Sequence, residues 1–226
     1  MMGKSIECKG LIFDLDGTLV DSGEVVEKVW KMFADRYGFD FEKQVLPICH
    51  GRPAKYPLKE LLPRVTEEEM DAVEDEFNAI EMTMLEELKP IRGADILLPI
   101  LPPGKWAIAT SGDNNLASGR LKSAGLPIPK HFVTAGMYKN SKPHPDPFLM
   151  AAQSLGFEPE DCIVFEDSPA GIEGAKTAGC TVIGINLVEA AKKVSKPDYV
   201  INDMTEIRVS YEKDSFKIEF LKTIRR

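Results

Sequence analysis

The chain has 226 residues and a formal net charge of −8, from 36 acidic against 28 basic residues, and 43% of its residues are hydrophobic. This composition predicts a folded globular protein of one large domain, or of one domain with an insertion. It argues against a nucleic-acid partner, whose binding surface would carry a basic patch.

The four cysteines, Cys8, Cys49, Cys162 and Cys180, are scattered and show neither a C-x-x-C motif nor zinc-ligand spacing. We expect them to be free thiols in a reducing compartment. No apolar stretch is long enough for a signal peptide or a membrane span. We therefore expect a cytoplasmic protein with no membrane partner, and a monomer.

Short apolar runs alternate with helical patterns along most of the chain, which predicts an α/β fold with a parallel sheet. The expected strands lie, in chain order, within residues 10–16, 105–112, 131–135, 162–168 and 180–186. Helices are expected over 113–125, 146–156 and 168–179, because capping residues or an early proline open each pattern and a glycine closes it. The tail at 210–226 alternates polar and apolar residues, which favours an edge strand.

One segment, from about residue 23 to residue 89, interrupts this alternation with helical patterns alone. Its first helix carries Val26, Val29, Trp30 and Phe33 on one face, and a capping box at residues 66–69 opens another. We therefore expect a small helical domain at residues 22–88, inserted after the first strand. Residues 1–21 and 89–226 are expected to form the core domain.

Chemically active residues follow four of the predicted strands, at the edge of the sheet where sites of open α/β folds form. In chain order they are Asp14 and Asp16, then Thr110, Ser111 and Gly112, then Lys142, then Glu166 and Asp167. Taken alone, the first pair could be turn residues, the second group a helix cap, and the lysine a solvated loop residue. Their joint placement favours one charge-balanced site.

The residue types at these strand ends suit a phosphate ester and a hard cation. Carboxylates from two strand ends are typical ligands of Mg²⁺. Thr110, Lys142 and the backbone amides near Ser111 and Gly112 suit phosphate oxygens, and the following helix N-terminus adds a favourable dipole. Asp14 is then a candidate nucleophile, and Asp16 a candidate general acid and base.

The stretches FDLDGTLVDS, AIATSG, SKPHPDP and VFEDSPAGIEGAKTAG resemble the four motifs of the haloacid dehalogenase-like hydrolases, and the likeness spans about residues 9–186. It implies a Rossmann-like core with a helical C1 cap. It also implies that Asp14 is the nucleophile, Asp16 the acid and base, and Thr110 and Lys142 the phosphate ligands. Asp167 becomes a Mg²⁺ ligand beside Asp14 and Asp16, the latter through its main chain or side chain, and Glu166 either joins them or lies behind them. The second aspartate of the first motif favours phosphoryl transfer over dehalogenation.

Within that superfamily the chain is similar to sugar- and polyol-phosphate phosphatases, including those acting on hexose phosphates, 2-deoxyglucose 6-phosphate and glycerol 3-phosphate. The stretch CHGRPA resembles their cap signature, which makes His50, Gly51 and Arg52 candidate contacts for the substrate. The expected partner is thus a small phosphorylated metabolite, and the expected cofactor is Mg²⁺.

Two other functions fit the same motifs. A β-phosphoglucomutase-like hexose-phosphate mutase would need cap cations for a distal phosphate. The acidic stretch at 67–87 offers no obvious lysine partner, which argues against it, although Arg52 and Lys55 keep it open. A non-catalytic binding protein on this fold is the alternative of another class, and the full set of charged residues argues against it.

Overall fold

The computed structural model describes residues 4–49, 54–187 and 196–222. Its centre is a six-stranded parallel sheet in the order β6-β5-β2-β7-β8-β9. The strands are β2 (Gly10–Phe13), β5 (Trp106–Ala109), β6 (His131–Val133), β7 (Cys162–Glu166), β8 (Thr181–Ile185) and β9 (Tyr199–Ile201). The predicted α/β class is therefore confirmed. Strand β9 was not predicted from the sequence.

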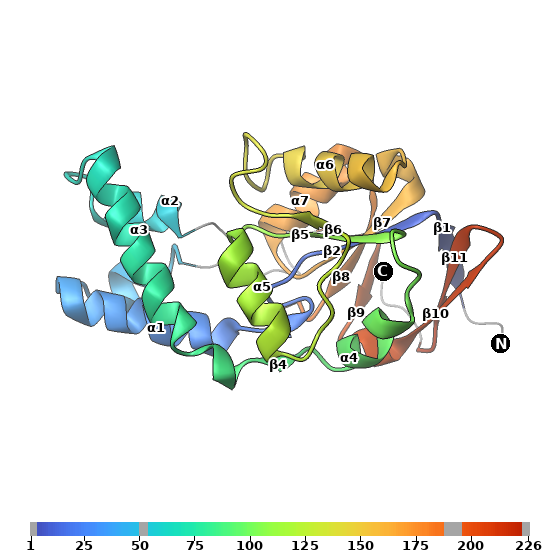
Figure 1. Ribbon diagram of the computed structural model, residues 1–226, viewed down its shortest axis with the longest axis horizontal. Helices are drawn as coiled ribbons and strands as arrows, with labels where there is room; N and C mark the ends of the chain where they lie inside the picture. Colours follow the sequence, from blue (N-terminus) through green and yellow to red (C-terminus); the bar gives the residue numbers. More distant parts are fainter. Residues whose placement is uncertain (1–3, 50–53, 188–195, 223–226) are drawn as a thin grey trace.

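Helices cover both faces of this sheet (Figure 1). Helices α6 (Asp146–Leu155) and α7 (Pro169–Ala178) lie on one face, and α4 (Ala94–Leu97) and α5 (Asn114–Ser123) on the other. Along β2, Ile12 packs with α6 and α7, while Leu11 and Phe13 belong to the opposite hydrophobic cluster. Because both faces are buried, the strands consist of continuous apolar runs rather than alternating ones.

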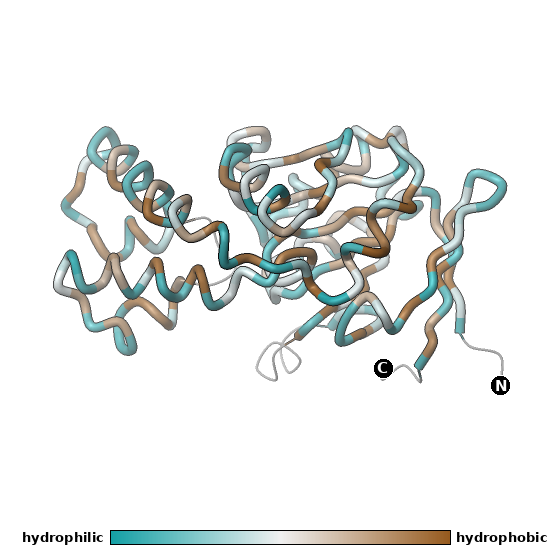
Figure 2. The backbone as a smooth tube through the Cα atoms, turned by 60° about the horizontal axis from the view of Figure 1, so that its bottom comes forward, coloured by the Kyte–Doolittle hydropathy of each residue, from teal (hydrophilic) through white to brown (hydrophobic). Residues whose placement is uncertain are grey.

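A helical segment, residues 22–88, stands beside the sheet (Figure 1). It contains α1 (Gly23–Tyr37), a π-helical turn at Phe41–Val45, α2 (Lys55–Leu61), α3 (Glu67–Met82) and a 3-10 turn at Leu85–Glu87. The rings of Trp30 and Phe77 lie 4.4 Å apart and join α1 to α3. Figure 2 shows how hydrophobic and hydrophilic residues alternate along these helices, as amphipathic helices require.

The predicted apolar face of α1 is confirmed. Val29, Trp30 and Phe33 are buried, and Val26 is partly buried and packs against the same hydrophobic cluster. Val25, which was not predicted, is buried as well, and both Val26 and Trp30 also line the cavity described below.

Two short strands connect the helical segment to the sheet. Strand β3 (Val20–Asp21) leads into α1, and β4 (Lys89–Pro90) leads back from the 3-10 turn. They pair in antiparallel register, with Val20 opposite Pro90. The two places where the chain crosses between the sheet and the helical segment, at β3 and at β4, therefore lie side by side.

The C-terminal region forms a separate sheet of β1 (Ser5–Cys8), β11 (Ser215–Phe220) and β10 (Ile207–Glu212), in that order. The prediction of an edge strand in the tail is wrong, because β11 pairs on both sides and is the middle strand. Polar and apolar residues alternate along β11 because one face of the strand is buried. Phe216, Ile218 and Phe220 all point into the hydrophobic core.

The four cysteines are free and buried, as predicted. The remaining short helices are 3-10 turns at Leu98–Ile100, Pro159–Asp161 and Met204–Glu206. Across the described ranges, no helix combines the length and the apolarity that crossing a bilayer requires.

Candidate active site

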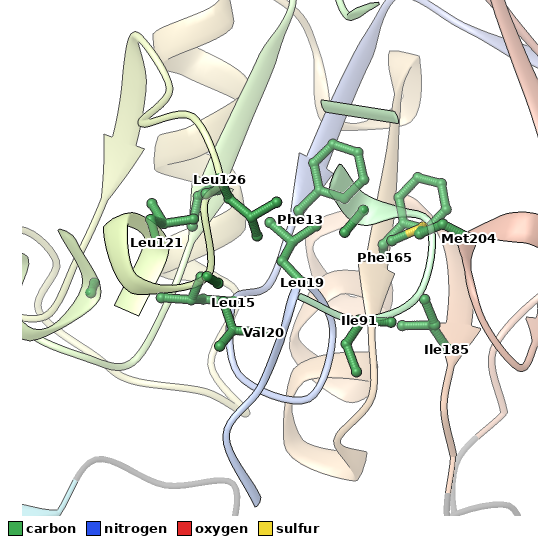
Figure 3. Close-up of a cluster of buried hydrophobic side chains, with 14 of the residues drawn as sticks. Phe13, Leu15, Leu19, Val20, Ile91, Leu121, Leu126, Phe165, Ile185 and Met204 are labelled. Carbon is green, nitrogen blue, oxygen red and sulfur yellow. The ribbon is translucent and has the colours of Figure 1, made fainter. Parts of the chain in front are cut away.

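The loop after β2 is fixed by its own apolar residues. Leu15, between the two aspartates, is fully buried, and Figure 3 shows it with Leu19 and Leu121 in one hydrophobic cluster. Because the residues on either side of a buried side chain point the other way, Asp14 and Asp16 both face the cavity described below.

Asp14 and Lys142 form a buried ion pair. Lys142 Nζ donates to Asp14 Oδ1 and, at 2.8 Å, to Glu166 Oε1. The other oxygen of Glu166 accepts from the amide of Ser168 at 2.7 Å and from its hydroxyl at 3.0 Å. Lys142 is therefore a positioned residue and not a solvated loop lysine. Glu166 is fully buried and lies behind it.

The charges at this site shift the pKa values of both partners. Burial, together with the charges of Glu166 and Asp16, raises the pKa of Asp14 to about 8, although Lys142 acts in the opposite direction. Burial alone would lower the pKa of Lys142, but the carboxylates of Asp14 and Glu166 outweigh it and raise that pKa. Lys142 thus stays protonated and supplies a fixed positive charge.

Asp167, at the end of β7, lies against the loop after β2. A Cβ on Gly17 would fall 2.1 Å from Asp167 Oδ2, and Gly17 has a φ of +78°, so both space and conformation require glycine there. The Thr18 hydroxyl donates to Asp167 Oδ1 at 3.4 Å. Burial, and then the charges of Glu166 and Asp14, raise the pKa of Asp167 well above its ordinary value.

In the loop after β5, side chains of the loop itself accept hydrogen bonds from the backbone amides. The Gly112 amide, predicted to bind phosphate, donates here to Thr110 Oγ1 at 3.1 Å. Asp113 caps α5 and accepts from the amides of residues 115 and 116, so the N-terminus of this helix already faces a carboxylate. The hydroxyl of Tyr138, which the sequence analysis did not single out, donates to the Thr110 carbonyl at 3.0 Å and fixes the loop from behind.

These loops and the helical segment enclose a cavity of about 550 Å³. All but one of the site residues predicted at strand ends line it, and the exception is Glu166. The lining residues from the sheet side include Asp14, Asp16, Thr110, Ser111, Gly112, Lys142 and Asp167. From the helical segment, the lining residues include Trp30, Phe77, Asn78 and Glu81.

Two charged residues that the sequence analysis missed also line this cavity. Arg120 of α5 pairs with Asp16 and with Glu81 of α3, and the side chains of Arg120 and Glu81 are 7% and 3% exposed. A signal was present in the sequence. Arg120 occupies the same helix face as the buried Leu116, Ala117 and Leu121. A charged residue on an apolar helix face needs a buried partner.

The cap residues His50, Gly51 and Arg52 lie outside the described residues. Two lysines of the helical segment form ion pairs with the acidic stretch 67–87, and neither lysine lines the cavity. Lys55 pairs with Asp71 at 2.6 Å, and Lys59 pairs with Glu67 at 2.7 Å. Both lysines belong to α2, which packs along α3, a contact that the sequence pattern alone does not reveal.

The negative charges of the carboxylates at this site suit a divalent cation. Asp14 and Asp167 are buried carboxylates with raised pKa values, which is the state that a cation at this place would relieve. The predicted set of three carboxylates is not gathered at one point, since no three potential ligand side chains converge within the described residues. The reason is Asp16, whose two oxygens accept from Arg120 and, at 2.8 Å, from Ser22.

The family model of the haloacid dehalogenase-like hydrolases matches residues 11–185, which include the four strand ends that carry the predicted site residues. The chain belongs to this family. It is 40% identical to hexitol phosphatase A of Escherichia coli, over 91% of this chain and 95% of that protein. It is 32% identical to glycerol-1-phosphate phosphohydrolase 2 of Saccharomyces cerevisiae, over 96% of this chain and 91% of that protein. These relatives confirm the predicted resemblance to the sugar- and polyol-phosphate phosphatases, and with them the assignment of this hydrolase to the phosphoric monoester hydrolases.

A crystal structure of β-phosphoglucomutase from Clostridium difficile superposes with a TM-score of 0.75 at 24% identity, covering 89% of this chain and 93% of that one. At this identity the likeness concerns the fold of the haloacid dehalogenase-like hydrolase and not its reaction.

Proposed function

We propose that this hydrolase is a Mg²⁺-dependent phosphatase that acts on the monophosphate of a small sugar or polyol through an aspartyl-phosphate on Asp14. The observation that carries the proposal is the buried pair of Asp14 and Lys142, with Asp16 lining the same cavity two residues further on. The helical segment, residues 22–88, is proposed as a domain that caps this cavity, and residues 1–21 and 89–226 as the core domain.

In the first step, a carboxylate oxygen of Asp14 attacks phosphorus and the bond to the sugar or polyol oxygen breaks. That oxygen takes a proton from Asp16, so the product leaves as a neutral alcohol. Lys142 holds Asp14 and supplies positive charge beside the phosphoryl group, and the Thr110 hydroxyl is near enough to the same cavity to donate to a phosphoryl oxygen.

In the second step, Asp16 accepts a proton from water while the water oxygen attacks phosphorus. The bond between phosphorus and Asp14 breaks, which releases inorganic phosphate and restores the Asp14 carboxylate. Asp16 is protonated again at the end, so both aspartates return to their starting states.

Asp14, Asp167 and the main-chain carbonyl of Asp16 would hold the Mg²⁺, because both side-chain oxygens of Asp16 are engaged by Ser22 and Arg120. The bound cation would offset the repulsion between these carboxylates and the phosphate of the substrate. Glu166 is assigned to Lys142 and Ser168 rather than to the cation.

The substrate class rests on the named relatives and on the charges of the cavity. Hexitol phosphatase A and the glycerol-1-phosphate phosphohydrolase are named for acyclic polyol phosphates. Among the described lining residues, the cationic side chains are Lys142 and Arg120, and each is paired with two carboxylates. A second phosphate would find neither of them free, and Arg52, the other cation that a mutase could use, lies outside the described residues. His50, Gly51 and Arg52 remain predicted contacts for the substrate hydroxyls.

The test is phosphate release from a panel of hexose, hexitol and glycerol monophosphates, with and without Mg²⁺. We expect Mg²⁺-dependent release by the wild type, and a loss of at least about 1,000-fold in Asp14→Asn, which lacks the nucleophile. Asp161→Asn is the matched control, since Asp161 is half exposed at the opposite end of β7. Release by Asp14→Asn at the wild-type rate would exclude the proposed mechanism.

The same panel separates the two enzyme functions. A mutase would leave the total phosphate unchanged and would isomerise a sugar monophosphate when a sugar bisphosphate is added. We expect no isomerisation. If it occurs without net hydrolysis, the mutase replaces the phosphatase as the function of this site.

A further inference from the structure

Asp16 is held at both of its carboxylate oxygens by groups from different parts of the chain. Oδ1 accepts from the hydroxyl of Ser22, the buried residue between β3 and α1, at 2.8 Å. Oδ2 accepts from Nη1 of Arg120, on α5. The proposed general acid is thus fixed from the first crossing into the helical segment and from the far wall of the cavity.

Arg120 is in turn held by the helical segment. Its Nε donates to Oε1 of Glu81 at 2.8 Å, and its Nη2 donates to the same oxygen. Glu81 lies one residue before the C-terminus of α3, which a 3-10 turn joins to the second crossing at β4. One guanidinium therefore connects Asp16 of the sheet side with α3 of the helical segment.

The three side chains differ in how far they can adjust. Arg120 and Glu81 are almost completely buried, whereas the side chain of Asp16 is 30% exposed. A guanidinium is planar, and its fork of donors has a fixed geometry, so fixing its Nε edge also fixes the direction of Nη1. With Glu81 in place, Nη1 points at Asp16. Without Glu81, that side chain is free to turn.

We propose that Arg120 is a positioning residue that couples the placement of the helical segment to the orientation of Asp16, with Glu81 as the link. The proposal rests on the proposed function, in which Asp16 gives a proton to the leaving oxygen. When α3 lies against α5, Glu81 fixes Arg120, and Arg120 fixes Asp16. When α3 moves away, Glu81 leaves with it, and Asp16 loses a defined orientation.

The two crossings at β3 and β4 determine how the helical segment can move relative to the sheet. β3 and β4 are hydrogen-bonded to each other, so the helical segment pivots at one place. Ser22 directly follows β3, and Glu81 lies at the end of α3, before the 3-10 turn that leads to β4. A rotation of the helical segment therefore changes at least one of the two contacts that hold Asp16.

The experiment compares two substrates that differ in their need for a proton. A polyol phosphate releases an alkoxide, which requires a general acid, whereas 4-nitrophenyl phosphate releases a stable phenolate, which does not. In Glu81→Ala and Arg120→Lys we expect kcat for the polyol phosphate to fall about 10- to 100-fold with KM little changed. For 4-nitrophenyl phosphate we expect the rate of the initial burst of 4-nitrophenolate, which reports the first step alone, to stay within about twofold, because only the later attack of water needs Asp16.

Two further variants separate this role from loss of stability. Glu81→Gln keeps the size and one accepting oxygen of the side chain, and should show the same selective loss to a smaller degree. Glu76→Gln breaks another carboxylate–arginine pair of α3, with Arg36 at 2.6 Å, which lies within the helical segment and does not reach Asp16. It should leave both kcat for the polyol phosphate and the burst rate of 4-nitrophenolate unchanged.

The outcomes are distinct. If the wild type hydrolyses both substrates and the variants at Glu81 and Arg120 lower kcat for the polyol phosphate and the burst rate of 4-nitrophenolate equally, or lower neither, the coupling is refuted while the proposed function stands. If the wild type hydrolyses neither substrate in Mg²⁺, the proposed function fails and the coupling fails with it. A selective loss in Glu81→Gln, absent in Glu76→Gln, supports the coupling even if Arg120→Lys does not fold.

Discussion

Asp14, Thr110, Lys142 and Asp167 could be predicted as site residues because each follows a parallel strand, and strand ends converge at one edge of the sheet. All four line the cavity. Arg120 and Glu81 could not be found by that rule, since both lie within helices. The sequence shows only that each is a charged residue on an apolar helix face. It identifies them as partners only once the packing of α5 against α3 is known.

At the residue scale, Asp167 illustrates how a site can oppose stability. Burial near Glu166 and Asp14 raises its pKa in the folded chain, so its ionisation opposes folding. The folded state is therefore favoured below the ordinary pKa of an aspartate, and this advantage is lost as the pH rises through the raised value. A bound cation would remove the cost.

We predict that Asp167→Asn raises the free energy of unfolding of the metal-free protein at neutral pH, by about 1–2 kcal/mol, because the amide carries no charge. The same variant should lose the increase in Tm that Mg²⁺ gives the wild type. Thermal denaturation with and without Mg²⁺ measures both effects. Asp161→Asn, at the exposed end of the same strand, should behave like the wild type. A less stable Asp167→Asn protein that still responds to Mg²⁺ would contradict this account.

At the element scale, the central strands and their helices could be predicted because apolar runs, caps and closing glycines agree along the chain. The N-caps at Asp113 and Ser168, and the capping box of α3, form as expected. The role of β11 could not be predicted, since its alternating pattern is the same for an edge strand and for a middle strand with one buried face. The pairing partners, distant in sequence, decide between them.

The packing of α7 on β7 depends on one glycine. A Cβ at Gly171, in the first turn of α7, would fall 1.5 Å from Oε1 of the buried Glu166. The carboxylate that holds Lys142 therefore occupies the space that a side chain at this helix position would need.

We predict that Gly171→Ala destabilises the protein by about 1–3 kcal/mol, because the buried carboxylate must move. It should also lower kcat, since Glu166 no longer holds Lys142 against Asp14. Chemical denaturation and steady-state kinetics test the two effects. Gly23→Ala is the control, because a Cβ at this helical glycine meets nothing within 4 Å. Equal stability of both variants would show that the first turn of α7 adjusts freely.

At the scale of the whole molecule, the sheet and the helical segment contribute different parts of the same site. The sheet edge supplies the residues proposed to bind the phosphate, and α1 and α3 supply Trp30, Phe77 and Asn78 to the rest of the cavity. The first part could be predicted from motif spacing. The second could not, because which helical residues face the sheet depends on how β3 and β4 orient the segment.

The measurement that tests the central claim most directly is the capture of a phosphoryl group on Asp14. In Asp16→Asn supplied with 4-nitrophenyl phosphate, the first step needs no acid but the second lacks its base, so the aspartyl-phosphate should accumulate. Acid quenching and peptide mass spectrometry should find the mass of one phosphoryl group on the peptide that contains Asp14. Turnover with no phosphoryl adduct, or with an adduct on another residue, would contradict the assignment of Asp14 as the nucleophile.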